Sequence, residues 1–138
     1  MSEIFTQELI NNVIAANRHI VAHRGESFGC NIERLGTVFN NVNSFNNISD
    51  KRLRIIKKAA HLLGGITWQQ PFSNGNKSTA LVATKYFLRK NGFDLRLLTP
   101  QEEDELIDLL TRTIFKFEDD STIITEVEEY LLRKVEQL

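Results

Sequence analysis

The chain has 138 residues, of which 41% are hydrophobic, and this suits one core in a single domain over residues 1–138. Its 17 basic and 18 acidic residues leave a formal net charge of -1, which gives no indication of a nucleic-acid partner or an anionic membrane. No apolar run approaches the roughly 20 residues that span a bilayer, and a single cysteine, Cys30, excludes an internal disulfide. We therefore expect a cytoplasmic protein.

Apolar residues that recur every three or four positions predict helices along the first half of the chain. The first helix runs to about His23, and the segment from Arg24 to Cys30, which contains two glycines, is typical of a loop. A second helix leads to an Asn-rich connection, and Ser49 is the candidate N-cap of a third. The inward residues of these three helices are predicted to be Ile10, Val13 and Ile14; Leu35, Val38, Phe39 and Val42; and Leu53, Ile56, Ala60 and Leu63.

The pattern breaks over residues 69–76, where Pro71 disfavours helical geometry. A fourth helix then runs to Asn91-Gly92, and a short extended stretch covers residues 93–98. A cap, a proline at the first position and a carboxylate three residues after the cap make residues 99–102 a strong helix start. The inward residues of the last helix are predicted to be Ile124, Val127, Leu131 and Val135. The order predicts an all-α bundle of about six helices.

The segment between the third and fourth helices has an unusual composition. Phe72 is an apolar residue among loop formers and could anchor the loop to the core. Gly75 permits a positive φ, which lets backbone N–H groups converge on an anion, and Lys77 adds a full positive charge at the start of a helix. These features predict a phosphate-binding loop. The alternative is a capped interhelical turn with Phe72 as a plug, which composition alone favours.

Residues 70–80, QPFSNGNKSTA, resemble the signature of the Fic/Doc family. That signature is a histidine, a variable residue, phenylalanine, two further positions of which the second is acidic, glycine, asparagine, lysine or glycine, and arginine. The segments 59–63 and 79–94 are similar to the two helices that flank it, and the lysine after the asparagine is more like the Doc, or death-on-curing, branch. The resemblance implies a compact all-α Fic/Doc domain. It leaves open a short flap hairpin, for which residues 24–30 are the candidate.

Enzymes of this family transfer part of a nucleotide, AMP or a phosphate, onto a hydroxyl of a protein target. The resemblance therefore implies ATP or another nucleotide, together with magnesium, as cofactors. In the signature the histidine is the general base, the acidic residue holds the metal, and the arginine steadies the developing charge. The partners implied are a protein target and, for Doc-like members, an antitoxin-like protein.

This sequence departs from the signature at three positions. Gln70 replaces the histidine and cannot accept a proton near neutral pH. Asn74 replaces the acidic residue, so it would be a weak magnesium ligand, and Ser78 replaces the arginine. The positions that would still bind phosphate are Ser73, Gly75, Asn76 and Lys77.

We therefore expect a nucleotidyl- or phosphotransferase-type protein with impaired or altered activity. One alternative is an active enzyme in which Gln70 positions the substrate and Lys77 contacts phosphate. Another is a catalytically inactive module that binds a nucleotide or a protein, for example in a toxin–antitoxin system.

Other polar residues carry weaker indications. His19 and His23, four residues apart, could face one metal ion, but no third ligand is evident and surface histidines are the more frequent interpretation. His61 precedes the loop on the third helix, and a polar helix face is favoured over a substitute base. A basic cluster on the third helix is predicted to be a solvated face, with an acidic partner as the alternative; it comprises Lys51, Arg52, Arg54, Lys57 and Lys58.

Overall fold

The computed structural model describes residues 6–96, 99–115 and 121–138. Over these residues the chain forms six helices and two short strands, which confirms the predicted all-α bundle. The elements are α1 (Thr6–His23), α2 (Ile32–Asn43), α3 (Lys51–Gln69), α4 (Asn76–Lys90), β1 (Phe93–Leu95), α5 (Pro100–Phe115), α6 (Ser121–Lys134) and β2 (Val135–Gln137). None of the helices in this part of the chain is long and apolar enough to cross a membrane.

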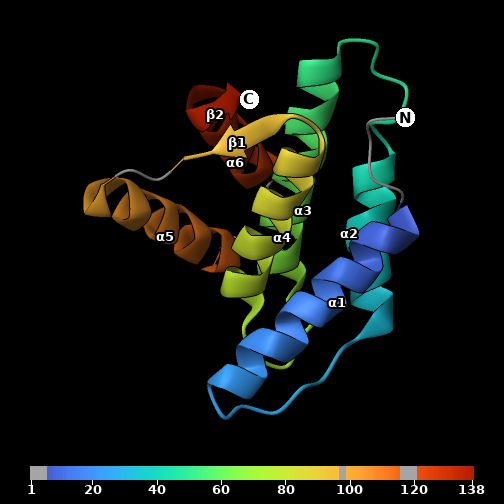
Figure 1. Ribbon diagram of the computed structural model, residues 1–138, viewed down its shortest axis with the longest axis vertical. Coiled ribbons are helices and arrows are strands. Elements are labelled where there is room, and N and C mark those ends of the chain that lie inside the picture. Colours follow the sequence, from blue (N-terminus) through green and yellow to red (C-terminus); the bar gives the residue numbers. More distant parts are fainter. Residues whose placement is uncertain (1–5, 97–98, 116–120) are drawn as a thin grey trace.

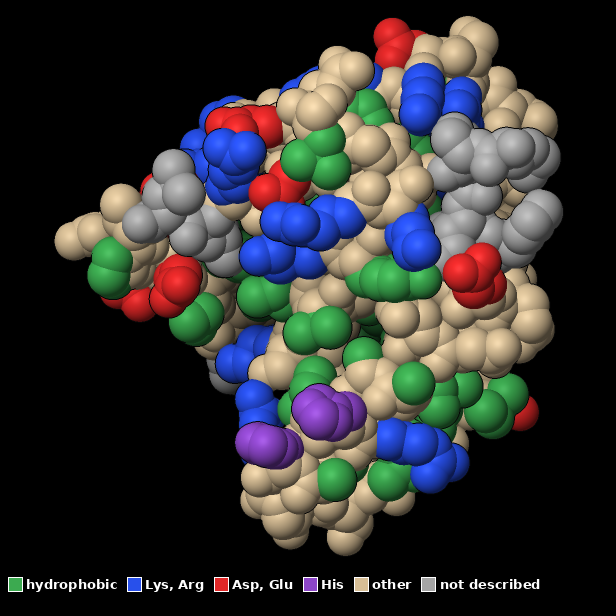
Figure 2. All heavy atoms as spheres, viewed as in Figure 1, with side chains coloured by type: hydrophobic (Ala, Val, Ile, Leu, Met, Phe, Trp, Pro, Cys, Tyr) green, Lys and Arg blue, Asp and Glu red, His purple; other side chains and the backbone are tan. Residues whose placement is uncertain are grey.

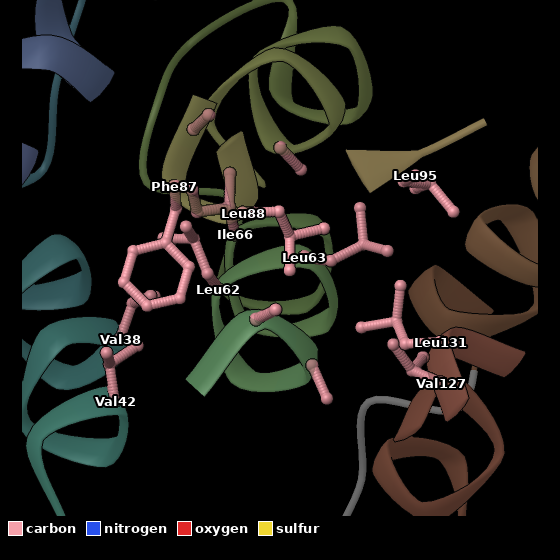
Figure 3. Packing of buried hydrophobic residues seen from close by; sticks show 14 of the residues in the cluster. Val38, Val42, Leu62, Leu63, Ile66, Phe87, Leu88, Leu95, Val127 and Leu131 are labelled. Carbon is pink, nitrogen blue, oxygen red and sulfur yellow. The ribbon is translucent and has the colours of Figure 1, made fainter. Parts of the chain in front are cut away.

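The helix α3 lies at the centre of the bundle and packs against α2, α4, α5 and α6 (Figure 1). Figure 3 shows Val38 of α2 and Phe87 of α4 on one side of it, and Val127 of α6 on another. Because α3 is covered on several sides, its buried residues extend well beyond the single stripe that the sequence predicted. Leu53 was predicted to point inward, but it lies near the exposed start of α3 and is 36% exposed.

The two strands join the end of α4 to the C-terminal end of the chain. β1 pairs antiparallel with β2, with Phe93 opposite Gln137 and Leu95 opposite Val135. The predicted extended stretch is thus confirmed for β1, whereas residues 97–98 lie outside the described part. Val135 is buried as predicted, but it lies in a strand and not in the last helix, because its backbone pairs with a segment 40 residues earlier.

Helix starts follow the local capping rules with one correction. The side chain of Asp50, and not that of Ser49, caps α3 by accepting a hydrogen bond from the amide of Leu53 at 2.9 Å. A carboxylate at this position also interacts favourably with the helix dipole. At α5 the predicted start is confirmed, since the hydroxyl of Thr99 accepts from the amide of Glu102 at 3.2 Å.

Two consecutive glycines inside α3 allow its neighbours to approach closely. A Cβ atom at Gly64 would lie 2.9 Å from Cδ1 of Ile124, on α6. A Cβ atom at Gly65 would lie 3.2 Å from Cγ1 of Val38, on α2. The pair therefore serves two helix interfaces, although glycine inside a helix costs roughly 0.5–1 kcal/mol relative to alanine.

Replacing Gly64 by leucine should lower the free energy of unfolding by about 1–3 kcal/mol, because the new side chain must displace α6. The matched control is Gly36→Leu on α2, where a Cβ atom would meet nothing within 4 Å. There the better helix former should raise stability by up to about 1 kcal/mol. Urea denaturation of both variants measures the difference, and equal effects would show that Gly64 has no packing role.

Candidate functional site

The loop that joins α3 to α4 is set by two residues with positive φ. Gln70 ends α3 with a φ of 48°, and its amide donates to the carbonyl of Ile66 at 3.0 Å. Gly75 immediately precedes α4 with a φ of 74°. A left-handed glutamine costs on the order of 1–3 kcal/mol, so the surrounding contacts must hold it there. The side chain of Gln70 is exposed.

Asn76 braces the loop from within. Its Nδ2 donates to the carbonyl of Phe72 at 2.8 Å, and its Oδ1 accepts from the amide of Phe72 at 3.0 Å. Phe72 is only 3% exposed, so the two hydrogen bonds and the buried ring fix the same residue. Asn76 was predicted to contact phosphate, and the contact that the structure gives it is with its own loop.

The helix α1 contacts the loop through Asn17, which is fully buried. Its Nδ2 donates to the carbonyl of Asn74 at 2.8 Å and to the hydroxyl of Thr79 at 3.0 Å. A Cβ atom at Gly75 would lie 3.4 Å from the same Nδ2 and 3.3 Å from Cγ2 of Ile20. Sequence reasoning missed Asn17, although a polar residue on the Leu9, Val13, Val21 face of α1 was the available signal.

The segment that connects α1 to α2 lies along the loop (Figure 1). Phe28 of this segment packs near Phe72, with ring centroids 6.4 Å apart. Three hydrogen bonds join the two: from the amide of Ser73 to the carbonyl of Gly29 (3.0 Å), from the amide of Asn31 to the carbonyl of Pro71 (2.6 Å), and from Nδ2 of Asn74 to the carbonyl of Ser27 (3.1 Å).

Residues 24–30 therefore do not form the flap hairpin for which they were the candidate. They make one isolated antiparallel bridge, between Cys30 and Phe72. A hairpin would need two strands that pair with each other, but here the carbonyls of Ser27 and Gly29 accept hydrogen bonds from the signature loop. The approach is close, because a Cβ atom at Gly29 would collide with Oγ of Ser73.

The first turn of α4 presents backbone donors that have no partner within the helix, together with positive charge. Gly75 provides no side-chain cap, and the amide of Thr79 donates to the carbonyl of Gly75 at 2.9 Å. The amides of Asn76, Lys77 and Ser78 therefore precede the first hydrogen bond inside the helix. Lys77 is exposed and forms no ion pair with a carboxylate in the described part of the chain.

A second cation reaches this turn from outside the signature. The guanidinium of Arg24, just after α1, donates from Nη2 to Oγ of Ser78 at 2.6 Å. Sequence analysis had placed Arg24 only at the edge of a loop. No local pattern brings it to Ser78, because 54 residues separate the two in the chain.

The first turn of α4 opens into a groove of about 460 Å³ between α4 and α5. The groove is lined by apolar and polar side chains, namely Leu81, Leu106, Ile107 and Leu110 together with Lys77, Ser78, Lys85 and Glu103. Figure 2 shows acidic side chains over the α5 side of the visible face and at several other places, and basic side chains spread over its upper, middle and lower parts. Lys77 and Ser78 belong both to the loop and to the groove.

The three histidine side chains make no hydrogen bond to the loop in the described part of the chain. The rings of His19 and His23 are 5.7 Å apart, and the described residues contain no group of three side chains that could hold a metal ion. His61 packs 4.7 Å from the ring of Phe45, in a hollow whose lining includes no residue of 70–78. Burial there lowers the pKa of His61; the charge of Lys57 lowers it further, and that of Glu128 opposes the shift.

The basic cluster of α3 is largely used within the fold. Arg52 donates to the carbonyls of Leu132 and Val135, at 3.3 and 3.2 Å. Lys57 pairs with Glu128 at 2.9 Å, and Lys58 is buried. The predicted solvated face is thus wrong for Lys58, and Arg52 and Lys57 bind α6 and β2 and are not left free for an acidic partner.

Comparison with protein-family models gives one further observation: the model of the Fic/DOC family matches residues 7–88, more than half of the chain. The chain belongs to the Fic/Doc family. Comparisons with curated proteins and with solved structures gave no match. The match begins in α1 and ends in α4, so it includes every segment that positions the Fic/Doc signature loop. The wall of the groove that α5 provides lies beyond it.

Asn76→Ala should lower the free energy of unfolding by about 1–3 kcal/mol, because the backbone N–H and C=O of Phe72 both lose their side-chain partner. Thermal unfolding followed by circular dichroism measures the change. Asn40→Ala is the control, since Asn40 lies exposed on α2 and its side chain makes no hydrogen bond in the described part. If both variants unfold alike, Asn76 does not brace the loop.

Proposed function

We propose that this Fic/Doc-family chain is a Doc-like protein that binds the phosphate end of a nucleotide at its signature loop. In this proposal the transfer of AMP or phosphate onto a protein hydroxyl is strongly impaired, because the signature is degenerate. The observation that carries the proposal is the uncapped first turn of α4 beside Lys77.

The electrostatics of this turn favour an anion. Backbone amides at a helix N-terminus point at the ligand, and the helix dipole adds a positive potential. Lys77 contributes a full charge that no carboxylate in the described residues neutralises. The groove along α4 and α5 then offers an apolar surface, on which the rest of a nucleotide could lie next to its phosphates.

The loop lacks a side chain that could act as the general base for proton transfer. Gln70 is exposed, and its amide is not a base near neutral pH. Among the described residues no histidine side chain makes a hydrogen bond to the loop. General-base catalysis contributes about 10²–10⁴-fold, and this is the factor that we expect to be lost.

The loop is also a poor magnesium site. Magnesium in phosphate-transfer sites is bound through carboxylates together with the substrate's phosphates. Residues 70–78 contain no carboxylate, and the side chain of Asn74 is bonded through Nδ2 to the carbonyl of Ser27. The donor set therefore does not fit a metal held by the protein, and we assign it no step.

A protein-interaction module, such as a partner in a toxin–antitoxin system, is the second candidate. The observation that favours it is the segment 24–31, which lies on the loop and occupies the amide of Ser73 and the side chain of Asn74. In that case the site is closed by its own chain, and nucleotide does not bind.

Titration calorimetry with ATP and GTP, each with and without magnesium, separates the two candidates. We expect binding in the micromolar range that Lys77→Ala weakens about 10-fold, since a charged hydrogen bond contributes about 1.5–3 kcal/mol. Lys51→Ala, which removes an exposed lysine at the start of α3, is the matched control for net charge. Absence of binding to the unmodified protein would reject nucleotide binding and favour the interaction module.

Gln70→His alone should not restore robust transfer of AMP or phosphate, because Asn74 and Ser78 still lack the charges of the signature. The triple variant Gln70→His, Asn74→Asp, Ser78→Arg should exceed the single variant by about 10²-fold or more. Transfer of label from ATP carrying ³²P in its α- or γ-phosphate onto protein, measured in a cell lysate, tests this. Activity of the single variant equal to that of the triple would contradict the assignment of three impaired positions.

A further inference from the structure

Arg24 is held in place by the end of α1. Its amide donates to the carbonyls of Ile20 and Val21, each at 3.2 Å, as the helix closes. Gly25 then turns the chain with a φ of 67°. The position of the Arg24 backbone is therefore set by helix geometry and not by a free loop.

The spacing along α1 aims Arg24 at α4. Asn17, Val21 and Arg24 are four and then three residues apart, so they share one face of the helix. Asn17 already contacts Thr79 in the first turn of α4, at 3.0 Å. Arg24 follows Asn17 by about two helical turns. Its guanidinium contacts Ser78, which lies in the same first turn of α4 as Thr79, at 2.6 Å.

No carboxylate in the described residues forms an ion pair with Arg24, whereas Arg89, Arg96, Arg112 and Arg133 each form at least one. Arg18 and Arg34 also lack an ion pair there, but Arg18 lies over the ring of Phe28 and Arg34 donates to the carbonyl of Gln69. The side chain of Arg24 instead makes one hydrogen bond in the described residues, to a neutral hydroxyl. Guanidinium has five donors in a planar fork that matches phosphate, so most of them are available to a ligand.

We propose that Arg24 supplies the phosphate-binding guanidinium of this site and that Ser78 positions it. The inference rests on the proposed phosphate binding at the signature loop. A guanidinium thereby reaches the phosphates for binding from another segment, across the α1–α4 interface, although the signature position of Ser78 itself stays without a charge. Arg24 and Lys77 would then contact the same phosphate group from α1 and α4, while the first-turn amides of α4 bind it along the helix axis.

Relocation of the guanidinium tests the proposal. Inorganic tripolyphosphate and ATP are titrated calorimetrically, at 50 and 150 mM salt, into the whole chain and its variants. Arg24→Ser should weaken binding about 10–100-fold, as expected for loss of a charged, bidentate contact. The double variant Arg24→Ser, Ser78→Arg moves the guanidinium onto α4 and should restore affinity to within about 3-fold of the unmodified protein.

Two further variants separate ligand binding from a structural tie between α1 and α4. Arg24→Lys keeps the charge but loses the fork, so it should bind several-fold more weakly than the unmodified protein and more tightly than Arg24→Ser. Arg133→Ser, at an exposed arginine of α6, should leave binding unchanged. Unfolding curves of all variants show whether any loss of binding follows loss of folding, and Arg24→Lys carries the test if Arg24→Ser is unfolded.

The possible outcomes are distinct. If the unmodified protein binds neither ligand, the proposed function fails and this inference fails with it. If it binds and Lys77→Ala weakens binding while Arg24→Ser does not, the phosphate site stands and the role of Arg24 is rejected. If Arg24→Ser weakens binding but the double variant does not restore it, Arg24 only ties α1 to α4, which also rejects the proposal.

Discussion

The buried side-chain amide of Asn17 is the contact on which the site depends. By donating to the carbonyl of Asn74 and to the hydroxyl of Thr79, it joins α1 to the last part of the loop and to the first turn of α4. A buried donor that loses its partner costs about 1–3 kcal/mol, so this geometry is strongly preferred over its alternatives. It also makes the space beside Gly75 tight, since a Cβ atom there would lie 3.3 Å from Cγ2 of Ile20, and it brings the end of α1 within reach of Ser78.

Once the loop is held in this way, its polar groups divide into two sets. The first set is hydrogen-bonded within the protein and comprises the backbone N–H and C=O of Phe72, the amide of Ser73 and the side chain of Asn74. The first-turn amides of α4 and the charges of Lys77 and Arg24 are not neutralised by other groups of the described chain. A ligand that is anionic and approaches along the axis of α4 would use the second set without disrupting the first. This division is the reason for favouring phosphate binding over a fully closed loop.

Local signals predicted the helices and the signature loop well, because periodicity, proline, glycine and capping residues act within a few positions of the chain. Thr99 is one example, since its cap on α5 depends only on Glu102. Contacts between distant segments were not predictable: Val135 extends into a strand because β1 is beside it, and Arg24 reaches Ser78 because α1 crosses α4. The prediction of Ser49 as the cap of α3 was wrong by one residue, because Asp50 is the cap and either side chain can cap a helix.

On the proposed function, binding and catalysis need not be lost together. The proposed phosphate binding rests on several backbone amides and two cations, so we expect no single substitution to remove it. Proton transfer would rest on one side chain with a suitable pKa, which the glutamine at position 70 does not supply. Asn74 and Ser78 are neutral where the signature is charged, yet each now bonds the segment after α1: Asn74 through the carbonyl of Ser27, and Ser78 through Arg24. In the proposed function, the residues that lack the charges of the signature thus also bond to the segment after α1. The neutral hydrogen bond of Asn74 contributes about 0.5–1.5 kcal/mol. Restoring the charged residues would break these contacts, so we expect regained transfer activity to come with lower stability.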